Sequence, residues 1–175
     1  METHLNKISK VHSIDTIIDY YVYLKQMDYN IIVVCDIDDT ILSSKIGQKF
    51  VEKNIKILIE DVYKCNPDNL IFLTAREFEY KRATNNQLNS AKMHHKTCYI
   101  LYNLLMSPDD INGCPTKGET FLNYFVKGKG QSLLCETKKN YILFIDDLKE
   151  QIKSVENCIT RLNNIDYTLF HYCFA

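Results

Sequence analysis

Two short apolar runs, residues 31–35 and 141–145, are each followed at once by aspartates. The first run leads into the segment DIDDT at 36–40, and the second leads into Asp146 and Asp147. Carboxylates are depleted in strands and costly to bury without partners, so aspartates at the ends of two buried strands need a physical reason. A hard divalent cation supplies one, because Mg²⁺ takes oxygen ligands and commonly uses one or two carboxylates together with phosphate.

The rest of the chain alternates between strand-like and helix-like patterns. Short apolar runs bounded by turn residues indicate strands, and apolar residues spaced three and four apart indicate helices. We expect strands at about 31–35, 70–73, 141–145 and 167–174, and helices at about 14–24, 48–64, 76–93, 117–125 and 148–162. The run 98–106 fits either type, the loop 107–116 has room for a very short strand near Ile111, and a strand stays an alternative for 121–125.

Strands that alternate with helices favour an α/β fold built on a parallel sheet. In such sheets the ligand binds beyond the carboxyl ends of the strands. The polar residues at these predicted ends are Asp36, Asp38, Thr74, Lys117, Asp146 and Asp147. We therefore expect the fold to bring them to one edge of the sheet, although they are far apart in the sequence.

Length and composition narrow the class of protein. A chain of 175 residues suits a single domain with a real core. The net charge of −1 offers no bulk attraction to nucleic acid or to anionic lipid. Seven cysteines without a C-x-x-C pair favour neither a disulfide framework nor a zinc site and point to a reducing, cytoplasmic compartment. The polar residues 1–10 lack the apolar core of a signal peptide, and no apolar stretch approaches the length of a membrane span.

Asp36 and Asp38 are two residues apart, so on an extended backbone their side chains point the same way. One can then act as a nucleophile while the other transfers protons to the same substrate. A carboxylate can attack phosphorus to give an aspartyl phosphate, and Mg²⁺ reduces the repulsion between the two anions. Asp38 would protonate the leaving oxygen and then take a proton from the attacking water. A lysine, together with a hydroxyl or backbone N–H groups, can hold the remaining phosphate oxygens. Thr74, at a strand end and just before a predicted helix, lies where a helix N-terminus would favour an anion.

Four segments match the motifs of a known family in order. Residues 36–40, 73–76, 117–118 and 144–147 resemble the first to fourth motifs of the haloacid dehalogenase-like (HAD) superfamily. The resemblance covers about residues 12–174 and is closest to a little-described bacterial branch of that superfamily. It implies a Rossmann-like parallel sheet sandwiched by helices, with minimal or no cap.

The resemblance also implies an aspartate-nucleophile phosphatase that depends on Mg²⁺. It makes Asp36 the nucleophile and Asp38 the acid/base, and it assigns phosphate binding to Thr74 and Lys117. The implied ligands of Mg²⁺ are Asp36, the backbone carbonyl of Asp38, Asp146 and, directly or through water, Asp147.

Two lysines stay alternatives to Lys117 as the third-motif residue, namely Lys127 and Lys129. Lys117 is preferred because the segment after it, with Glu119 in the first turn, has the pattern of an amphipathic helix. For Arg76, pairing with a nearby glutamate and contact with substrate are both open.

The size of the insertions suggests what enters the site. Residues 41–48 are too few for a cap domain, and residues 98–116 have room for a small insert only. An uncovered site admits large substrates, so we expect a macromolecular phosphate ester such as a phosphotyrosyl protein. Its phenol (pKa about 10) needs less acid assistance to leave than an alkoxide does. Two alternative enzymes from the same superfamily are a small-metabolite phosphatase and a nucleic-acid 3′-phosphatase. The alternative without catalytic activity is a Mg²⁺- or phosphate-binding domain that recruits a partner.

Two further expectations concern where the protein acts and whether the chain is part of a longer protein. The resemblance to a branch found in intracellular bacteria suggests an effector that acts in the cytosol of a host cell. The chain ends directly after an apolar strand, so a single domain over 1–175 and one domain of a longer protein are both consistent with the sequence. The oligomeric state is not constrained.

Overall fold

The computed structural model describes residues 7–44, 49–76, 78–91, 99–102 and 116–174. Six strands form one sheet in the order β1-β6-β5-β2-β3-β4, and every pair of neighbours runs parallel. The strands are β1 (Lys7–Val11), β2 (Asn30–Cys35), β3 (Leu70–Thr74), β4 (Tyr99–Tyr102), β5 (Asn140–Asp146) and β6 (Ile165–Tyr172). The strands that carry aspartates at their ends, β2 and β5, are neighbours near the middle of the sheet.

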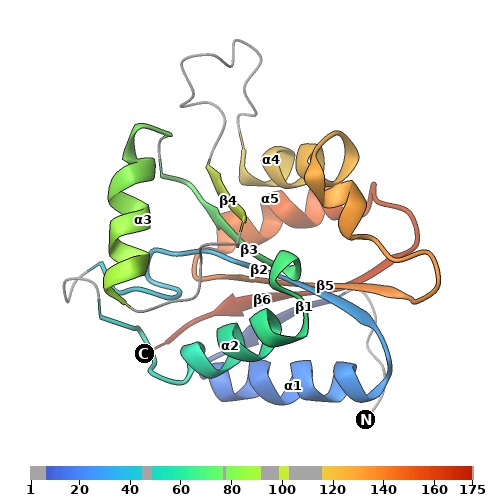
Figure 1. Cartoon of the computed structure of the whole chain (residues 1–175), viewed down its shortest axis with the longest axis horizontal. Coiled ribbons are helices and arrows are strands. Elements are labelled where there is room, and N and C mark those ends of the chain that lie inside the picture. The colour runs from blue at the N-terminus through green and yellow to red at the C-terminus, as the bar shows by residue number, and fades with distance from the viewer. Residues whose placement is uncertain (1–6, 45–48, 77, 92–98, 103–115, 175) are drawn as a thin grey trace.

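Helices cover both faces of the sheet. In Figure 1, α1 and α2 lie below it, and α4 and α5 lie above it. The helices are α1 (Ile14–Gln26), α2 (Ile55–Cys65), α3 (Lys81–Ser90), α4 (Lys117–Val126) and α5 (Lys149–Ile159), with 3₁₀ turns at Pro67–Asn69, Phe78–Tyr80 and Lys129–Leu133. The predicted α/β sandwich is confirmed. The longest helix of the described part of the chain, α1, has 13 residues, and none there qualifies as a membrane span.

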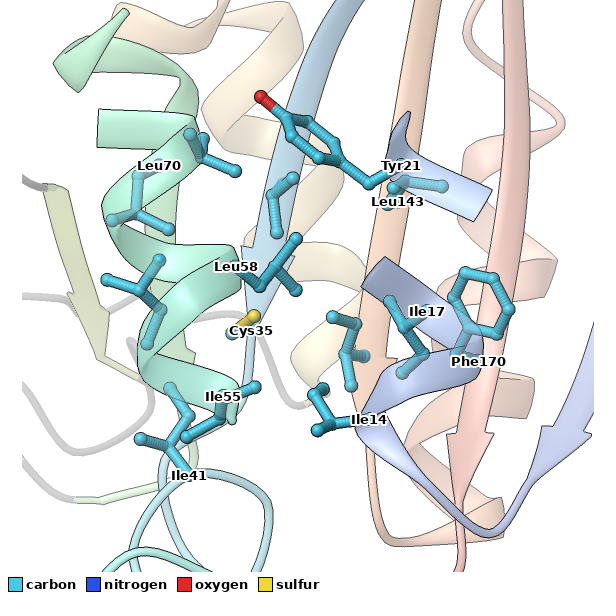
Figure 2. Close-up of a cluster of buried hydrophobic side chains, with 14 of the residues drawn as sticks. Ile14, Ile17, Tyr21, Cys35, Ile41, Ile55, Leu58, Leu70, Leu143 and Phe170 are labelled. Atoms are coloured by element: carbon cyan, nitrogen blue, oxygen red, sulfur yellow. The ribbon is translucent and has the colours of Figure 1, made fainter. Parts of the chain in front are cut away.

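The continuous apolar run of β2 follows from burial on both sides. Alternate residues of a strand point to opposite faces. Val33 and Cys35 therefore pack into the core between the sheet and helices α1 and α2, whereas Ile32 and Val34 pack into the core between the sheet and helices α4 and α5. Figure 2 shows the first of these cores, where side chains from the two helices gather around Cys35. A strand buried on both faces has no polar position until it ends, and Asp36 is the first residue beyond it.

The predicted second helix, 48–64, is shorter than expected and begins at Ile55. The preceding segment is held by Glu52, whose Oε1 accepts hydrogen bonds from the backbone N–H of Ile14 at 2.7 Å and from the hydroxyl of Tyr172 at 2.6 Å. Glu52 thereby accepts a hydrogen bond at the amino end of α1, where the backbone N–H groups lack partners within the helix. The backbone of residues 49–51 also pairs with residues 41–43, so these residues make long-range contacts in place of helical ones. The predicted third helix, 76–93, is likewise shorter and spans Lys81–Ser90.

Strand β1 was not predicted, because its alternation of polar and apolar residues is short and lies within a polar amino-terminal segment. It pairs with β6 at the edge of the sheet. Residues 99–102 of the ambiguous run form strand β4, paired with β3, and therefore belong to the sheet. Residues 103–115, which hold the rest of the expected insert and the strand considered near Ile111, lie outside the described residues. For 121–125 the helix is confirmed and the strand alternative is wrong.

Candidate functional site

A pocket of about 310 Å³ lies at the carboxyl ends of the central strands. The described residues that line it are Asp36, Asp38, Asp39, Ala75, Arg76, Lys117, Asp146, Asp147, Leu148 and Gln151. Neighbouring strands in the order β5-β2-β3 bring these segments together. Of the six residues predicted from the sequence, all but Thr74 are in this lining.

Lys117 is the lysine at the site. It is the first residue of α4, whose N-cap Thr116 accepts a hydrogen bond from the backbone N–H of Glu119 at 3.2 Å. Its buried Nζ donates to Asp36 Oδ1 at 2.7 Å and to Asp146 Oδ2 at 2.5 Å. Lys127 and Lys129 are exposed and lie beyond the other end of α4. The helix therefore separates them from the carboxylates by its whole length, about 15 Å.

Gly118 explains how Lys117 reaches so deep. A Cβ at this position would lie 2.0 Å from the backbone oxygen of Ser154 in α5, and the Gly118 N–H donates to Ser154 Oγ at 2.8 Å. Any larger residue would collide with the backbone of the neighbouring helix. Glycine therefore lets the first turn of α4 pack directly against α5, and this contact fixes the base of the lysine side chain.

Thr40 connects the two aspartate segments. Its hydroxyl lies 3.2 Å from Asp36 Oδ2 and accepts a hydrogen bond from the backbone N–H of Asp147 at 3.1 Å. On the other strand, Asp146 Oδ1 accepts from the backbone N–H of Leu148 at 2.9 Å. Asp36 and Asp146 are thus each oriented by hydrogen bonds as well as by Lys117.

Asp38 is bound by Arg76. The guanidinium donates through Nε to Asp38 Oδ2 at 2.8 Å and through Nη2 to Asp38 Oδ1 at 2.6 Å. Its Nη1 donates to Thr84 Oγ1 at 2.9 Å and to Gln87 Oε1 at 2.6 Å, both on α3. A paired, two-bond geometry of this kind orients a carboxylate more strictly than a single bond does. The sequence had left the partner of Arg76 open, since the loop after β2 and helix α3 meet it only in the folded chain.

Thr74 is fully buried at the end of β3, and its Oγ1 accepts a hydrogen bond from the backbone N–H of Arg76 at 3.2 Å. It is not among the described residues that line the pocket. The hydroxyl therefore shapes the turn that carries Arg76. Within the described part of the chain no acceptor takes the proton of this hydroxyl, so it can serve a second acceptor.

The carboxylates form a cluster suited to a divalent cation. Asp36, Asp146 and Asp147 each offer an oxygen, and these oxygens lie within 4.8 Å of one another. Burial raises the pKa of Asp36 to about 6 although Lys117 lowers it, and burial together with the charge of Asp36 raises the pKa of Asp147 to about 6. Three carboxylates and one ammonium leave a formal charge of −2 at neutral pH. A cation that prefers oxygen ligands fits this donor set.

The same burial predicts how stability depends on pH in the absence of metal. An acid whose pKa is higher in the folded than in the unfolded chain destabilises the fold when it ionises. For Asp36 this cost is absent well below 3.8, grows as the pH rises and is complete above about 6. In EDTA, the free energy of unfolding of the wild type minus that of Asp36→Asn should fall by about 2 kcal/mol between pH 4.5 and 7.5. Urea unfolding of both proteins measures it, and a difference that is constant with pH would contradict the burial argument.

Comparisons with known proteins give the family of this chain and the kind of fold it has. Residues 46–175 match the model of a family described as "Protein of unknown function (DUF2608)". The chain belongs to the DUF2608 family. No curated protein matches.

One solved structure has a fold similar to that of this DUF2608 protein. The chain is similar to the HAD domain of the effector protein Lem4 from Legionella pneumophila, with a TM-score of 0.58 and 15% sequence identity over 83% of this chain and 86% of that one. The HAD-like fold expected from the four motifs is thereby confirmed. At this identity the comparison concerns the fold, and the roles of the site residues rest on the geometry above.

The sequence did not single out every residue of the site. Thr40, Leu148 and Gln151 had no assigned role, and Arg76 had no assigned partner. The sequence offered weak indications for them, because Thr40 follows Asp36 by one helical turn's spacing and Leu148 directly follows the second aspartate pair. Their contacts depend on loops from different strands, so position in the chain alone did not identify them.

Proposed function

We propose that this DUF2608 protein is a Mg²⁺-dependent phosphatase that hydrolyses phosphate monoesters through an aspartyl phosphate on Asp36. The observation that carries the proposal is the position of the buried Lys117 Nζ between Asp36 and Asp146, next to an oxygen cluster completed by Asp147. A lysine and a cation site next to the same carboxylate provide the positive charge that an anionic nucleophile needs to approach a phosphate.

Each residue has a role in the two steps. A carboxylate oxygen of Asp36 forms a bond to phosphorus as the bond from phosphorus to the ester oxygen breaks. Asp38, in a protonated form that keeps only one of its two contacts with Arg76, gives its proton to that leaving oxygen. Asp38 then takes a proton from the water that attacks the aspartyl phosphate. Lys117 holds Asp36 in place and neutralises charge on the transferring group. Arg76 orients Asp38, and Thr40 orients the second oxygen of Asp36.

Mg²⁺ would be held by Asp36, the backbone carbonyl of Asp38, Asp146 and Asp147, and when bound it would supply charge neutralisation and orientation of the phosphate. Phosphate binding by Thr74 is proposed through the proton of its hydroxyl, whose oxygen already accepts the Arg76 N–H. Lys117 is the stronger candidate of the two, since its charged group lines the pocket.

We propose a macromolecular substrate such as a phosphotyrosyl protein. Only residues 41–54 separate the first acidic segment from α2, too few for a lid domain over the pocket.

We further propose that residues 1–175 form a single phosphatase domain. The described cysteines are free thiols, in keeping with a reducing cytosol. Lem4, whose HAD domain has a similar fold, is an effector, and this favours the host cell as the place of action. A small-metabolite or nucleic-acid 3′-phosphatase and a non-catalytic recruitment domain are the alternatives.

Hydrolysis of para-nitrophenyl phosphate tests the proposal. We expect turnover that requires added Mg²⁺, is abolished by EDTA and is restored by excess Mg²⁺. A panel of phosphotyrosyl and phosphoseryl peptides, sugar phosphates and a 3′-phosphorylated oligonucleotide then separates the substrate classes. No hydrolysis at any Mg²⁺ concentration would favour the recruitment domain, and fastest turnover of the sugar phosphates would exclude the macromolecular substrate.

A further inference from the structure

Leu148 occupies a position where leucine is unfavourable on two counts. It is the N-cap residue of α5, where serine, threonine, aspartate and asparagine are preferred because their side chains accept a hydrogen bond from the first helical N–H groups. Leu148 makes no such side-chain bond. Its side chain is also a large apolar group that is 50% exposed. Local rules of this kind are broken mainly at functional sites, so the location of Leu148 matters.

That location is the candidate active site. Leu148 lines the pocket that holds Asp36, Asp146 and Lys117. Its backbone is fixed at both ends, since its N–H donates to Asp146 Oδ1 at 2.9 Å and its carbonyl accepts from Gln151 and Ile152. An exposed side chain on a fixed backbone, two residues from a candidate metal ligand, is presented to whatever enters the pocket.

A second apolar residue lies on the other side of Asp36. Ala75 is exposed, follows β3 and lines the same pocket, whereas Leu148 follows β5. In the sheet, β5 and β3 are the two neighbours of β2, which carries Asp36 at its end. The other described lining residues are charged or carry an amide. The pocket thus combines a charged centre with apolar contacts on both sides.

We propose that Leu148 and Ala75 bind the leaving group of the substrate and select phosphate esters of flat apolar groups, that is aryl phosphates, over esters of polyhydroxylated alkyl groups. The proposal rests on the phosphatase function above and specifies which esters it favours. With phosphorus next to Asp36, the ester substituent extends into the remaining pocket. An aryl ring there is covered by apolar surface, whereas sugar hydroxyls against Leu148 would lose hydrogen bonds to water without replacement.

The substitution Leu148→Ser tests the proposal, because it should lower the activity on aryl phosphates without lowering the stability of the protein. Serine is a preferred N-cap, so the melting temperature should stay level or rise. The kcat/KM for phenyl phosphate should fall roughly tenfold, in line with the loss of methylene-sized contacts in a binding pocket. The kcat/KM for ribose 5-phosphate should change by less than about twofold, because that ester gains nothing from Leu148.

Two further variants complete the experiment. Leu148→Met keeps an apolar side chain of similar volume and should retain most of the activity on phenyl phosphate. Ile57→Ser removes a side chain of equal exposure, 49%, from α2 on the opposite face of the sheet and should change neither ester. Equal losses on both esters with Leu148→Ser, or no loss on phenyl phosphate, would overturn the selectivity proposal alone. Failure of the wild type to hydrolyse either ester would overturn the phosphatase function and the selectivity proposal with it.

Discussion

Replacing Asp36 by asparagine is expected to lower kcat/KM for para-nitrophenyl phosphate by about a thousandfold or more, the scale seen when an enzyme loses its nucleophile. The amide has the shape of the carboxylate but no negative charge, so it cannot form the acyl phosphate. It also removes one oxygen ligand from the cluster with Asp146 and Asp147. Steady-state rates at saturating Mg²⁺ measure the effect, and circular dichroism checks the fold.

The matched control for this change is Asp68→Asn. Asp68 is exposed at the start of the turn before β3, at the opposite edge of the sheet from the pocket. The same chemical substitution there should leave the rate within about twofold of the wild type, since surface changes away from special features have small effects. Equal rates for Asp36→Asn and the wild type would remove Asp36 as nucleophile.

Lys117→Met is expected to affect both activity and stability. Methionine fills a similar volume without charge, and it would leave Asp36 and Asp146 buried with no cation between them. Breaking a buried ion pair by removing one partner costs about 3–5 kcal/mol, so the free energy of unfolding in EDTA should fall by about 3 kcal/mol. Activity should fall by at least about a hundredfold, as for other charged groups that stabilise a transition state.

Lys127→Met separates this role from a general effect of losing a lysine on α4. Lys127 is exposed at the carboxyl end of the same helix, and its replacement should change the free energy of unfolding by no more than about 0.5 kcal/mol. Urea unfolding and the para-nitrophenyl phosphate assay measure both variants. A large loss of activity in Lys127→Met with an active Lys117→Met would show that the third-motif lysine had been assigned to the wrong residue.

The strands that carry the site could be predicted because their environment is uniform. A strand such as β2 is buried on both faces, so every residue from Ile31 to Cys35 is apolar, and its end is marked by Asp36. The same holds for β5 and Asp146. Strand β1 escaped prediction because it lies at the edge of the sheet, where residues such as Lys10 stay exposed and only the backbone pairing with β6 defines the strand.

The start of α2 was missed for a different reason. The pattern of residues 48–64 is compatible with a longer helix, and nothing local forbids it. Glu52 instead accepts hydrogen bonds from Ile14 and Tyr172, which lie 38 and 120 residues away in the sequence. A contact across such separations competes with helix formation only after the chain has folded.

The candidate site, too, could be predicted from the sequence only in part. Residue types, their spacing and their place after apolar runs were enough to bring Asp36, Asp38, Asp146 and Asp147 into one predicted site, because parallel strands end at a common edge. The sequence favoured Lys117 through the helix pattern after it but left Lys127 and Lys129 as alternatives. It could not give Arg76 its partner Asp38 or place Leu148 beside the carboxylates. Those features depend on distances between segments that are remote in the chain, and only the packing of α3, α4 and α5 against the sheet sets such distances.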